Sequence, residues 1–349
     1  MQKKLASLFL CALGAIGAVS YGLFANTTVY EIQPVLAASH PANYDPYVYS
    51  GNYYSGISGT GASLRAALTT LIHPTSVPKY SGTGDNTLAQ HLQKADEDPT
   101  NSSNMIYLYT RNSVKKNAAG SWNREHVWPQ SLSNNCWGQG RAGADMLHLR
   151  PTYNTTNSTR SNDLYGEVTG GTERVYNGIT YGYSKNGYFM PLDSVKGDVA
   201  RICMYVWVAY HDEYLSRLPA LTKVFQSMDV LMSWHIQDKP DVMEGNRNNY
   251  VESSTQGNRN PFVDHPEYAW KIFGDKEFNL SQSVYNQAVA TYPDSGYNPT
   301  PGPGEDPTTP AANGCGGNVM TTSITLSAIA LVGAVTLFAR EIVKKKKEN

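Results

Sequence analysis

The chain has 349 residues, enough to bury a full core in one large domain or two small ones, and we favour one. Lys and Arg number 28 against 29 Asp and Glu, a net charge of -1, so overall charge neither indicates nor excludes a nucleic-acid ligand. Any such ligand would need local arginines and a bound cation. Four scattered cysteines without a CxxC pair exclude a disulfide framework and a zinc ribbon.

Residues 1–37 have the pattern of a secretory signal segment. Two lysines precede an uncharged apolar run over residues 5–24, and small residues follow near Ala25 and Ala37. We therefore expect the chain to be exported, with cleavage after either alanine. The run is long for a signal, so an uncleaved N-terminal anchor is the alternative.

Residues 41–283 are expected to form a single α+β domain. Apolar residues at helical spacing predict helices over 63–72 and 88–94, and an apolar run predicts a buried strand over 105–109. The acidic turn DEDP at residues 96–99 is expected to be solvated rather than to bind a cation.

The second half of this domain continues the same mixture. Alternating aromatic and small residues over 170–189 predict a β-hairpin, and helical periodicity predicts helices over 196–214 and 224–235. In the polar stretch 256–267, two prolines argue against a regular element. Such a stretch either lines a site or satisfies buried backbone groups. Cys136 and Cys203 are compatible with one disulfide or with two buried thiols.

The C-terminal part predicts a membrane anchor. Residues 284–318 are rich in Pro, Gly and Thr and read as a tether, and residues 319–339 are an uncharged run. At about 1.5 Å per residue, such a run spans a hydrocarbon core of about 30 Å. The basic tail, residues 340–349, would then be cytoplasmic and the domain extracellular.

The most unusual stretch is residues 122–168, where charged and amide side chains alternate with apolar ones. Glu125 and His126 lie on an expected strand, with 107–111 a candidate neighbour. Adjacent strand residues face opposite ways, so the two share one site only if the strand ends there, and Pro129 supplies a reason for that end. A carboxylate that binds a hard cation beside an imidazole that activates water is a complete hydrolytic pair.

A short helix is expected over residues 157–162, capped by Thr152 or by the turn after it. Asn157, Arg160 and Ser161 would then share one face. An amide oxygen suits a hard divalent ion, and a guanidinium can form two hydrogen bonds to a phosphate. These residues together imply a phosphodiester substrate.

With these motifs in place, the chain resembles the bacterial endonuclease I family of secreted nonspecific nucleases, whose active site is a His-Me (ββα-metal) finger. The likeness is carried by NREHVWPQS at 123–131, DMLHLRP at 145–151, NSTRSN at 157–162 and QGNRNPFVDHPE at 256–267. It covers roughly residues 44–274.

The resemblance implies that His126 is the general base, and that Glu125 and Asn157 hold one Mg²⁺, with Mn²⁺ or Ca²⁺ as alternatives. Cleavage at the 3′ oxygen would leave 5′-phosphate ends. Arginines are also expected near the scissile phosphate, and Arg160 and Arg150 are the catalytic candidates. The candidate substrate contacts are Arg124, Arg141, His148 and Asn162.

One position departs from the family pattern. Relatives commonly show paired histidines in the segment that reads DMLHL here, whereas Leu147 precedes the single His148. If the absent histidine orients the base or the metal shell, activity would be reduced.

The expected protein is therefore a monomeric, metal-dependent nuclease on the outer face of the cell membrane, either anchored there or released. It would cut DNA, with RNA as a further substrate, without sequence preference, because phosphate and metal contacts carry no base information. Two alternatives remain: an inactive surface binding or adhesion protein on a nuclease fold, and a phosphodiesterase for small molecules.

Overall fold

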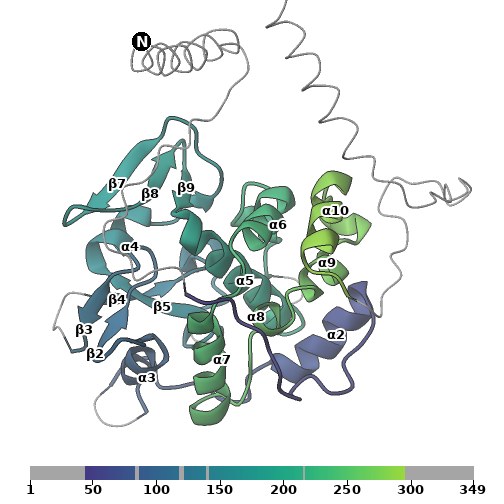
Figure 1. Cartoon of the computed structure of the whole chain (residues 1–349), viewed down its shortest axis with the longest axis horizontal. Coiled ribbons are helices and arrows are strands. Elements are labelled where there is room, and N and C mark those ends of the chain that lie inside the picture. The colour runs from purple at the N-terminus through teal and green to yellow at the C-terminus, as the bar shows by residue number, and fades with distance from the viewer. Residues whose placement is uncertain (1–43, 83–85, 118–121, 139–140, 215–216, 295–349) are drawn as a thin grey trace, which may run out of the picture. The chain divides into compact units, whose positions relative to one another are not determined.

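The computed structural model describes residues 44–82, 86–117, 122–138, 141–214 and 217–294, and these form the mixed α+β fold that was expected (Figure 1). The helices are α2 (Gly61–Ile72), α3 (Leu88–Ala95), α4 (Asn154–Arg160), α5 (Asp193–Tyr210), α6 (Met228–Gln237), α7 (Val242–Ser254), α8 (Pro261–Asp264), α9 (Tyr268–Phe273) and α10 (Gln282–Thr291). The strands are β1 (Glu97–Asp98), β2 (Asn101–Ile106), β3 (Ser113–Lys115), β4 (Trp122–His126), β5 (Leu149–Tyr153), β6 (Leu164–Tyr165), β7 (Thr172–Tyr176), β8 (Ile179–Lys185) and β9 (Tyr188–Pro191). Short 3₁₀ turns lie at Gln130–Leu132, Arg141–Gly143, Leu221–Lys223 and Lys276–Phe278.

In the described part of the chain, the strands form small separate sheets. Their orders are β1-β2-β3, β4-β5 and β6-β9-β8-β7. Strands β7 and β8 pair antiparallel, so the predicted hairpin over 170–189 is confirmed. Strand β9 extends it, and β6 adds to β9 in parallel. Helices α3 and α4 contact β5, and α5 contacts β9.

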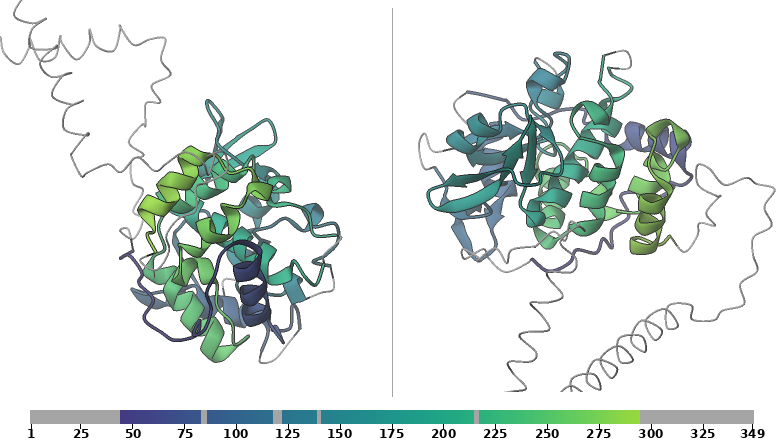
Figure 2. Two further views of the ribbon diagram at one scale, coloured as in Figure 1. Left: turned by 90° about the vertical axis from the view of Figure 1, so that its right-hand side faces the viewer. Right: turned by 90° about the horizontal axis from the view of Figure 1, so that it is seen from above.

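Helix α5 is the centre of the core. Every residue from Val195 to Tyr210 is buried, so this helix is covered on all sides. It contacts α2, α6 and α8 as well as β9. The ribbon views show the strands gathered on one side of the domain and α2, α9 and α10 on the other (Figures 1 and 2).

The helices predicted from periodicity are all present as α2, α3, α5 and α6. Their starts have local chemical causes. The Thr87 hydroxyl accepts the Gln90 amide and the Gln90 side chain accepts the Thr87 amide, a capping box at the start of α3. The Ser227 hydroxyl caps α6 by accepting the Val230 amide. Helix α6 therefore begins four residues later than the apolar pattern indicated.

Three local predictions were wrong. Strand β4 pairs with β5 and not with residues 107–111, and β2 ends at Ile106, before the buried tyrosines that follow it. The stretch 256–267 does contain a regular element, α8. Its Pro261 occupies the first helical turn, where a missing amide proton costs nothing, and the Asn260 side chain caps it.

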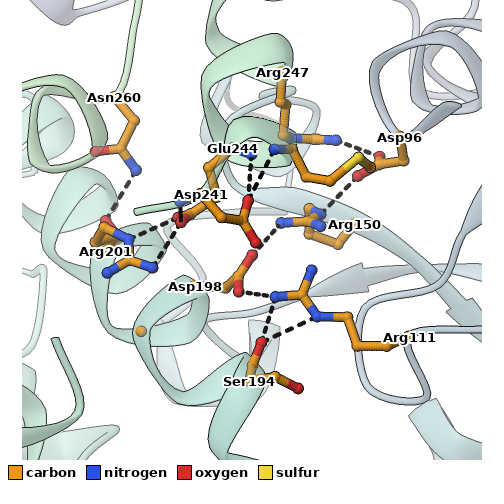
Figure 3. Close-up of polar contacts among 12 residues, drawn as sticks. Asp96, Arg111, Arg150, Ser194, Asp198, Arg201, Asp241, Glu244, Arg247 and Asn260 are labelled. Carbon is orange, nitrogen blue, oxygen red and sulfur yellow. Dashed lines mark hydrogen bonds and ion pairs between the residues drawn. The ribbon is translucent and has the colours of Figure 1, made fainter. Parts of the chain in front are cut away.

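The acidic turn was also predicted wrongly, because Asp96 is buried rather than solvated. It is 1% exposed and forms ion pairs with Arg150, at 2.9 Å, and with Arg247. Figure 3 shows both arginines at Asp96, and it shows Arg150 reaching Asp198 as well, at 3.1 Å. Asp198 also pairs with Arg111. A buried charge without a partner is costly, so each of these charges depends on the others for its partner. The ion pairs therefore link β5 to α5 and α7.

The predicted ends of the chain fall outside the described residues. The signal segment 1–37, the uncharged run 319–339 and the basic tail 340–349 all belong to that part. No helix in the described part is long and apolar enough to cross a membrane. Residues 284–294, predicted as the start of the tether, belong largely to α10, and the Trp270 indole donates to the Tyr292 carbonyl at 2.8 Å.

The two cysteines of the domain are buried free thiols. Cys136 and Cys203 are not bonded to each other, which decides between the two alternatives that their sequence left open. Burial raises the pKa of the Cys203 thiol, so this side chain behaves as a small apolar group in the core.

Candidate active site

Strands β4 and β5 and helix α4 form a compact ββα unit. In the β4–β5 register, Glu125 faces Arg150 and His126 faces Leu149. Helix α4 begins directly after β5 and contacts both strands. Thr152 does not cap it, because this residue lies within β5 and its hydroxyl contacts Thr156 instead, at 2.8 Å.

A cleft of about 750 Å³ opens over this unit. It is lined by six predicted site residues: Glu125, His126, Asn157, Arg160, Arg124 and Asn162. Strand β4 ends at His126, and Pro129 follows two residues later. Because the strand ends there, the neighbouring Glu125 and His126 both reach the cleft, as their sequence predicted.

The Glu125 carboxylate is held by one of its two oxygens. Oε1 accepts the Tyr109 hydroxyl at 2.6 Å and lies 3.2 Å from Nη2 of Arg160. The side chain is 1% exposed, and burial raises its pKa, while Arg160 and Tyr109 act to lower it. Oε2 has no recorded partner among the described residues, so it is the oxygen available to a cation.

His126 is fixed in one tautomer by the backbone. Its Nε2 lies 3.0 Å from the Gly143 carbonyl, which can only accept, so Nε2 carries the proton. Nδ1 is therefore the nitrogen that can accept a proton. Burial lowers the pKa of His126 to about 3, with the neighbouring His148 the next cause, and this keeps the imidazole neutral.

Arg160 is a buried residue that contacts several groups of the site. It is 1% exposed, and Nη2 donates to the Val127 carbonyl and to the Tyr165 hydroxyl as well as lying against Glu125. Its guanidinium also lies over the Tyr165 ring, 4.7 Å from the centroid. These contacts of Nη2 hold Glu125 and the end of β4 in position, whereas Nε of Arg160 is buried without a partner among the described residues.

Helix α4 ends at the cleft in an unusual backbone conformation. Ser161, the residue after the helix, has φ +53° and ψ -120°, and it lines the cleft beside Asn157 and Asn162. A serine rarely adopts a positive φ, so the surrounding structure must enforce it. The bend ends α4, and Asn157 lines the cleft from within the helix.

The residues present fit a single divalent ion better than a metal cage. Among the described residues, no three His, Cys, Asp or Glu side chains converge on one point. Glu125 Oε2 and the Asn157 amide oxygen offer two hard oxygen ligands at one cleft. Mg²⁺ binds in this way, with few protein ligands and its other positions filled by water and phosphate oxygens.

Three predicted site residues lie away from the cleft. Arg150 is in the buried network with Asp96 and Asp198, and Arg141 donates to the Pro74 carbonyl at 3.1 Å. His148 is fully buried behind His126, with ring centroids 5.3 Å apart. Its Nδ1 donates to the Ala142 carbonyl at 2.8 Å and its Nε2 accepts the Trp128 amide at 3.2 Å, so it fixes the chain around His126.

Known proteins resemble this chain over most of the domain. The model of the family described as Endonuclease I matches residues 60–267. That match decides the family. The chain belongs to the endonuclease I family. An extracellular ribonuclease of Bacillus subtilis (strain 168) is 37% identical over 241 residues, which are 65% of this chain and 80% of the relative. An extracellular ribonuclease of Bacillus amyloliquefaciens is 34% identical over 303 residues, 78% of this chain and 100% of the relative.

This endonuclease I chain is thus an enzyme, a nuclease, as its sequence predicted. Leu147, the residue that departs from the family pattern, is 3% exposed and does not line the cleft. The neighbouring Asp145 accepts from Tyr205 at 2.6 Å and from Gln256 at 2.8 Å, which joins the motif at 145–151 to the one at 256–267. The polar stretch therefore satisfies buried groups and does not line the cleft.

Sequence reasoning missed Tyr80, which lines the endonuclease I cleft beside Arg124 of β4. The Arg124 guanidinium lies over its ring, 4.1 Å from the centroid, and donates to its backbone carbonyl at 2.7 Å. The ring also stacks near His126, with centroids 6.0 Å apart. Tyr80 lies in a loop without a recognisable motif. The only signal in the sequence was an aromatic residue among polar neighbours.

We expect this endonuclease I domain to lose stability as the pH falls below about 6.5. Burial lowers the pKa of His148 to about 4 and that of His235 to about 3, whereas an unfolded histidine titrates near 6.5. Both folded values are lower, so the unfolded state binds more protons in acid. The stability that these two histidines contribute is therefore complete above pH 6.5, and each histidine removes up to about 1.4 kcal/mol per pH unit below it.

Thermal melts between pH 7.5 and 4.5 check this expectation. The variant His235→Gln keeps a donor for the Pro266 carbonyl, which His235 Nε2 contacts at 3.0 Å, but has no titrating group. Its melting temperature should depend less steeply on pH than that of the wild type. Equal slopes in both proteins would contradict the assignment to His235.

Proposed function

We propose that the chain is a metal-dependent endonuclease that hydrolyses phosphodiester bonds in RNA and DNA with little sequence preference. The carrying observation is that Glu125, His126 and Asn157 meet in one cleft, with Nδ1 of His126 left free to accept a proton. The names of both relatives favour RNA as a substrate beside the DNA that the family resemblance implied.

In this proposal, His126 Nδ1 takes the proton of the attacking water, while the Gly143 carbonyl keeps the ring oriented through Nε2. Glu125 Oε2 and the Asn157 amide oxygen bind one Mg²⁺, with Mn²⁺ or Ca²⁺ as alternatives. When bound, the ion would neutralise charge on the phosphate and on the leaving 3′ oxygen. Arg160 orients Glu125, and Arg124 and Asn162 contact the substrate backbone.

The low pKa of His126 is compatible with a base near neutral pH. A phosphodiester anion that enters the cleft favours the protonated imidazole and so raises that pKa. The rise occurs only with substrate bound, when a proton acceptor is needed. Base edges take no part in these contacts, so little sequence preference is expected.

We also propose that the enzyme works outside the cell, anchored by residues 319–339 after export through residues 1–37. The charge and apolar patterns of these two segments support the proposal. Cell fractionation checks it. Nuclease activity found only in the cytosol would contradict export, and activity found only in the medium would contradict the anchor.

The full-length chain should cut single-stranded RNA, single-stranded DNA and plasmid in Mg²⁺, and should lose this activity in EDTA. Excess Mg²⁺ should restore it. The same assay with a small phosphodiester, bis(p-nitrophenyl) phosphate, separates the alternatives. Faster turnover of the small ester than of any polynucleotide would favour a small-molecule phosphodiesterase. A folded chain that cuts nothing in any divalent ion would favour a binding protein.

A further inference from the structure

A second, smaller cavity adjoins the catalytic cleft. It has a volume of about 200 Å³ and is lined by Ala89, Trp122, Asn123 and Arg124. Asn123 and Arg124 also line the cleft, so the cavity and the cleft share two lining residues of β4. A chain that follows β4 out of the cleft therefore meets this cavity next.

Trp122 gives the cavity an aromatic wall. All tryptophans of the chain lie in its described part, and Trp122 alone is half-buried there, because Trp128, Trp137, Trp207, Trp234 and Trp270 are buried. Its indole packs against the buried cluster of Met105, Tyr107 and Tyr153. The ring is thus held in place before any ligand arrives, which lowers the entropy lost on binding.

The other walls are polar and suit a nucleotide. The Asn123 side-chain oxygen accepts the Arg124 amide at 2.8 Å, which leaves its NH₂ group as a donor for a hydrogen-bond acceptor, a group that every nucleobase carries. The Arg124 guanidinium is tied to Tyr80 and places positive charge where the cavity joins the cleft. An aromatic face, an amide and a cation are the groups that bind a base and its phosphate.

The spacing along β4 also fits a bound strand. Trp122 lies three residues before Glu125, which is about 10 Å at the rise of an extended strand. Stacked nucleotides repeat every 3.4 Å or so along one strand, and extended ones are farther apart. A base on Trp122 would therefore lie within about three nucleotides of the scissile phosphate.

We propose that this cavity receives a nucleobase of the strand that is cut, stacked on Trp122, and that the enzyme therefore prefers unpaired nucleic acid over stable duplex. The inference rests on the proposed function, since it assigns the substrate form of the same site. In a duplex, each base must leave its own stack before it can reach an aromatic platform, and that costs free energy. An unpaired base enters without that cost.

Cleavage kinetics of the full-length chain test the preference. The substrates are an unpaired oligonucleotide and a hairpin duplex of the same composition. In the variant Trp122→Leu, kcat/KM for the unpaired strand should fall about tenfold, the usual effect of removing one stacking platform, and that for the duplex should change little. Trp122→Phe keeps an aromatic ring and the packing on Tyr153, so it should keep most of the preference.

A uniform loss on both substrates would show that Trp122 acts only through folding, and no loss on either would show that the cavity is not used. Both outcomes overturn the inference and leave the nuclease function standing. The melting temperature of each variant shows whether the protein is folded at the assay temperature, so that a uniform loss of activity is not caused by global unfolding.

Binding of a nucleobase in the cavity can also be measured without catalysis. In the inactive variant His126→Ala, tryptophan fluorescence should be quenched by the unpaired oligonucleotide more than by the hairpin, since Trp122 is the accessible indole. Adding Trp122→Phe should abolish most of that quenching, whereas the matched change Trp207→Phe, of a buried indole, should preserve it. Equal quenching in all three proteins would refute the assignment even if no cleavage were ever detected.

Discussion

Replacing His126 with alanine is expected to lower kcat/KM for nucleic acid cleavage by about three orders of magnitude. A positioned general base contributes roughly 10² to 10⁴-fold, and Nδ1 of His126 is the free nitrogen in the cleft because Nε2 is committed to the Gly143 carbonyl. Initial rates on single-stranded RNA and DNA at saturating Mg²⁺ measure the loss. Added imidazole should restore part of the activity, because a small base can occupy the space that the side chain leaves.

The control for this change is His91→Ala. His91 contacts the Tyr250 hydroxyl at 2.8 Å and the Asn86 side chain at 2.9 Å, and it does not line the cleft. Its removal should change kcat/KM by no more than about twofold. The idea of His126 as base fails if His126→Ala, with an unchanged melting temperature, keeps more than about a tenth of the wild-type activity.

The fold could be predicted where the information is local. Helices α2, α3, α5 and α6 follow from apolar periodicity and capping residues, which act within a few positions of the chain. The partner of β4 could not be predicted in this way. Residues 107–111 are near in sequence, but β5 lies beyond an intervening stretch of irregular chain and 3₁₀ turns, and such non-local pairing leaves no periodic signal.

The candidate site, like the fold, could be predicted only in part. Glu125, His126 and Asn157 lie in sequence motifs and meet in the cleft. Arg150 also lies in such a motif, but its side chain is enclosed by Asp96 and Asp198. A short sequence does not reveal whether a charge faces solvent, a ligand or a buried partner. For the same reason Asp96 looked like a solvated turn residue, and Tyr80, in a loop without a motif, was missed.

The second large effect is expected for Glu125→Gln, which should lower Mg²⁺-dependent kcat/KM by about three orders of magnitude. Glutamine keeps an oxygen for the Tyr109 hydroxyl but loses the negative charge on the group that faces the cleft. A bound metal stabilises the charge of the transition state by several kcal/mol, so losing the metal costs about as much as removing the base. Removing the ion from the wild type with EDTA should match the effect of the substitution.

Arg160 complicates this test, because Glu125 is the carboxylate beside its buried guanidinium, at 3.2 Å. Breaking a buried ion pair costs about 3 to 5 kcal/mol, so a loss of activity from unfolding must be separated from a loss of metal. Titration of Mn²⁺ into the folded variant, below its melting temperature, makes that separation. Binding should weaken at least tenfold in Glu125→Gln and stay unchanged in the control Glu173→Gln, whose side chain is exposed on β7.

Asn157 supplies the complementary change. Asn157→Asp keeps an oxygen at the cleft and adds a charge, so it should still bind Mn²⁺, whereas Asn157→Leu should weaken binding without touching the Glu125–Arg160 pair. If Asn157→Leu binds Mn²⁺ as the wild type does while Glu125→Gln does not, then Glu125 holds the ion without Asn157. If neither change weakens binding, the ion lies elsewhere, and the loss in Glu125→Gln must come through Arg160 and the end of β4.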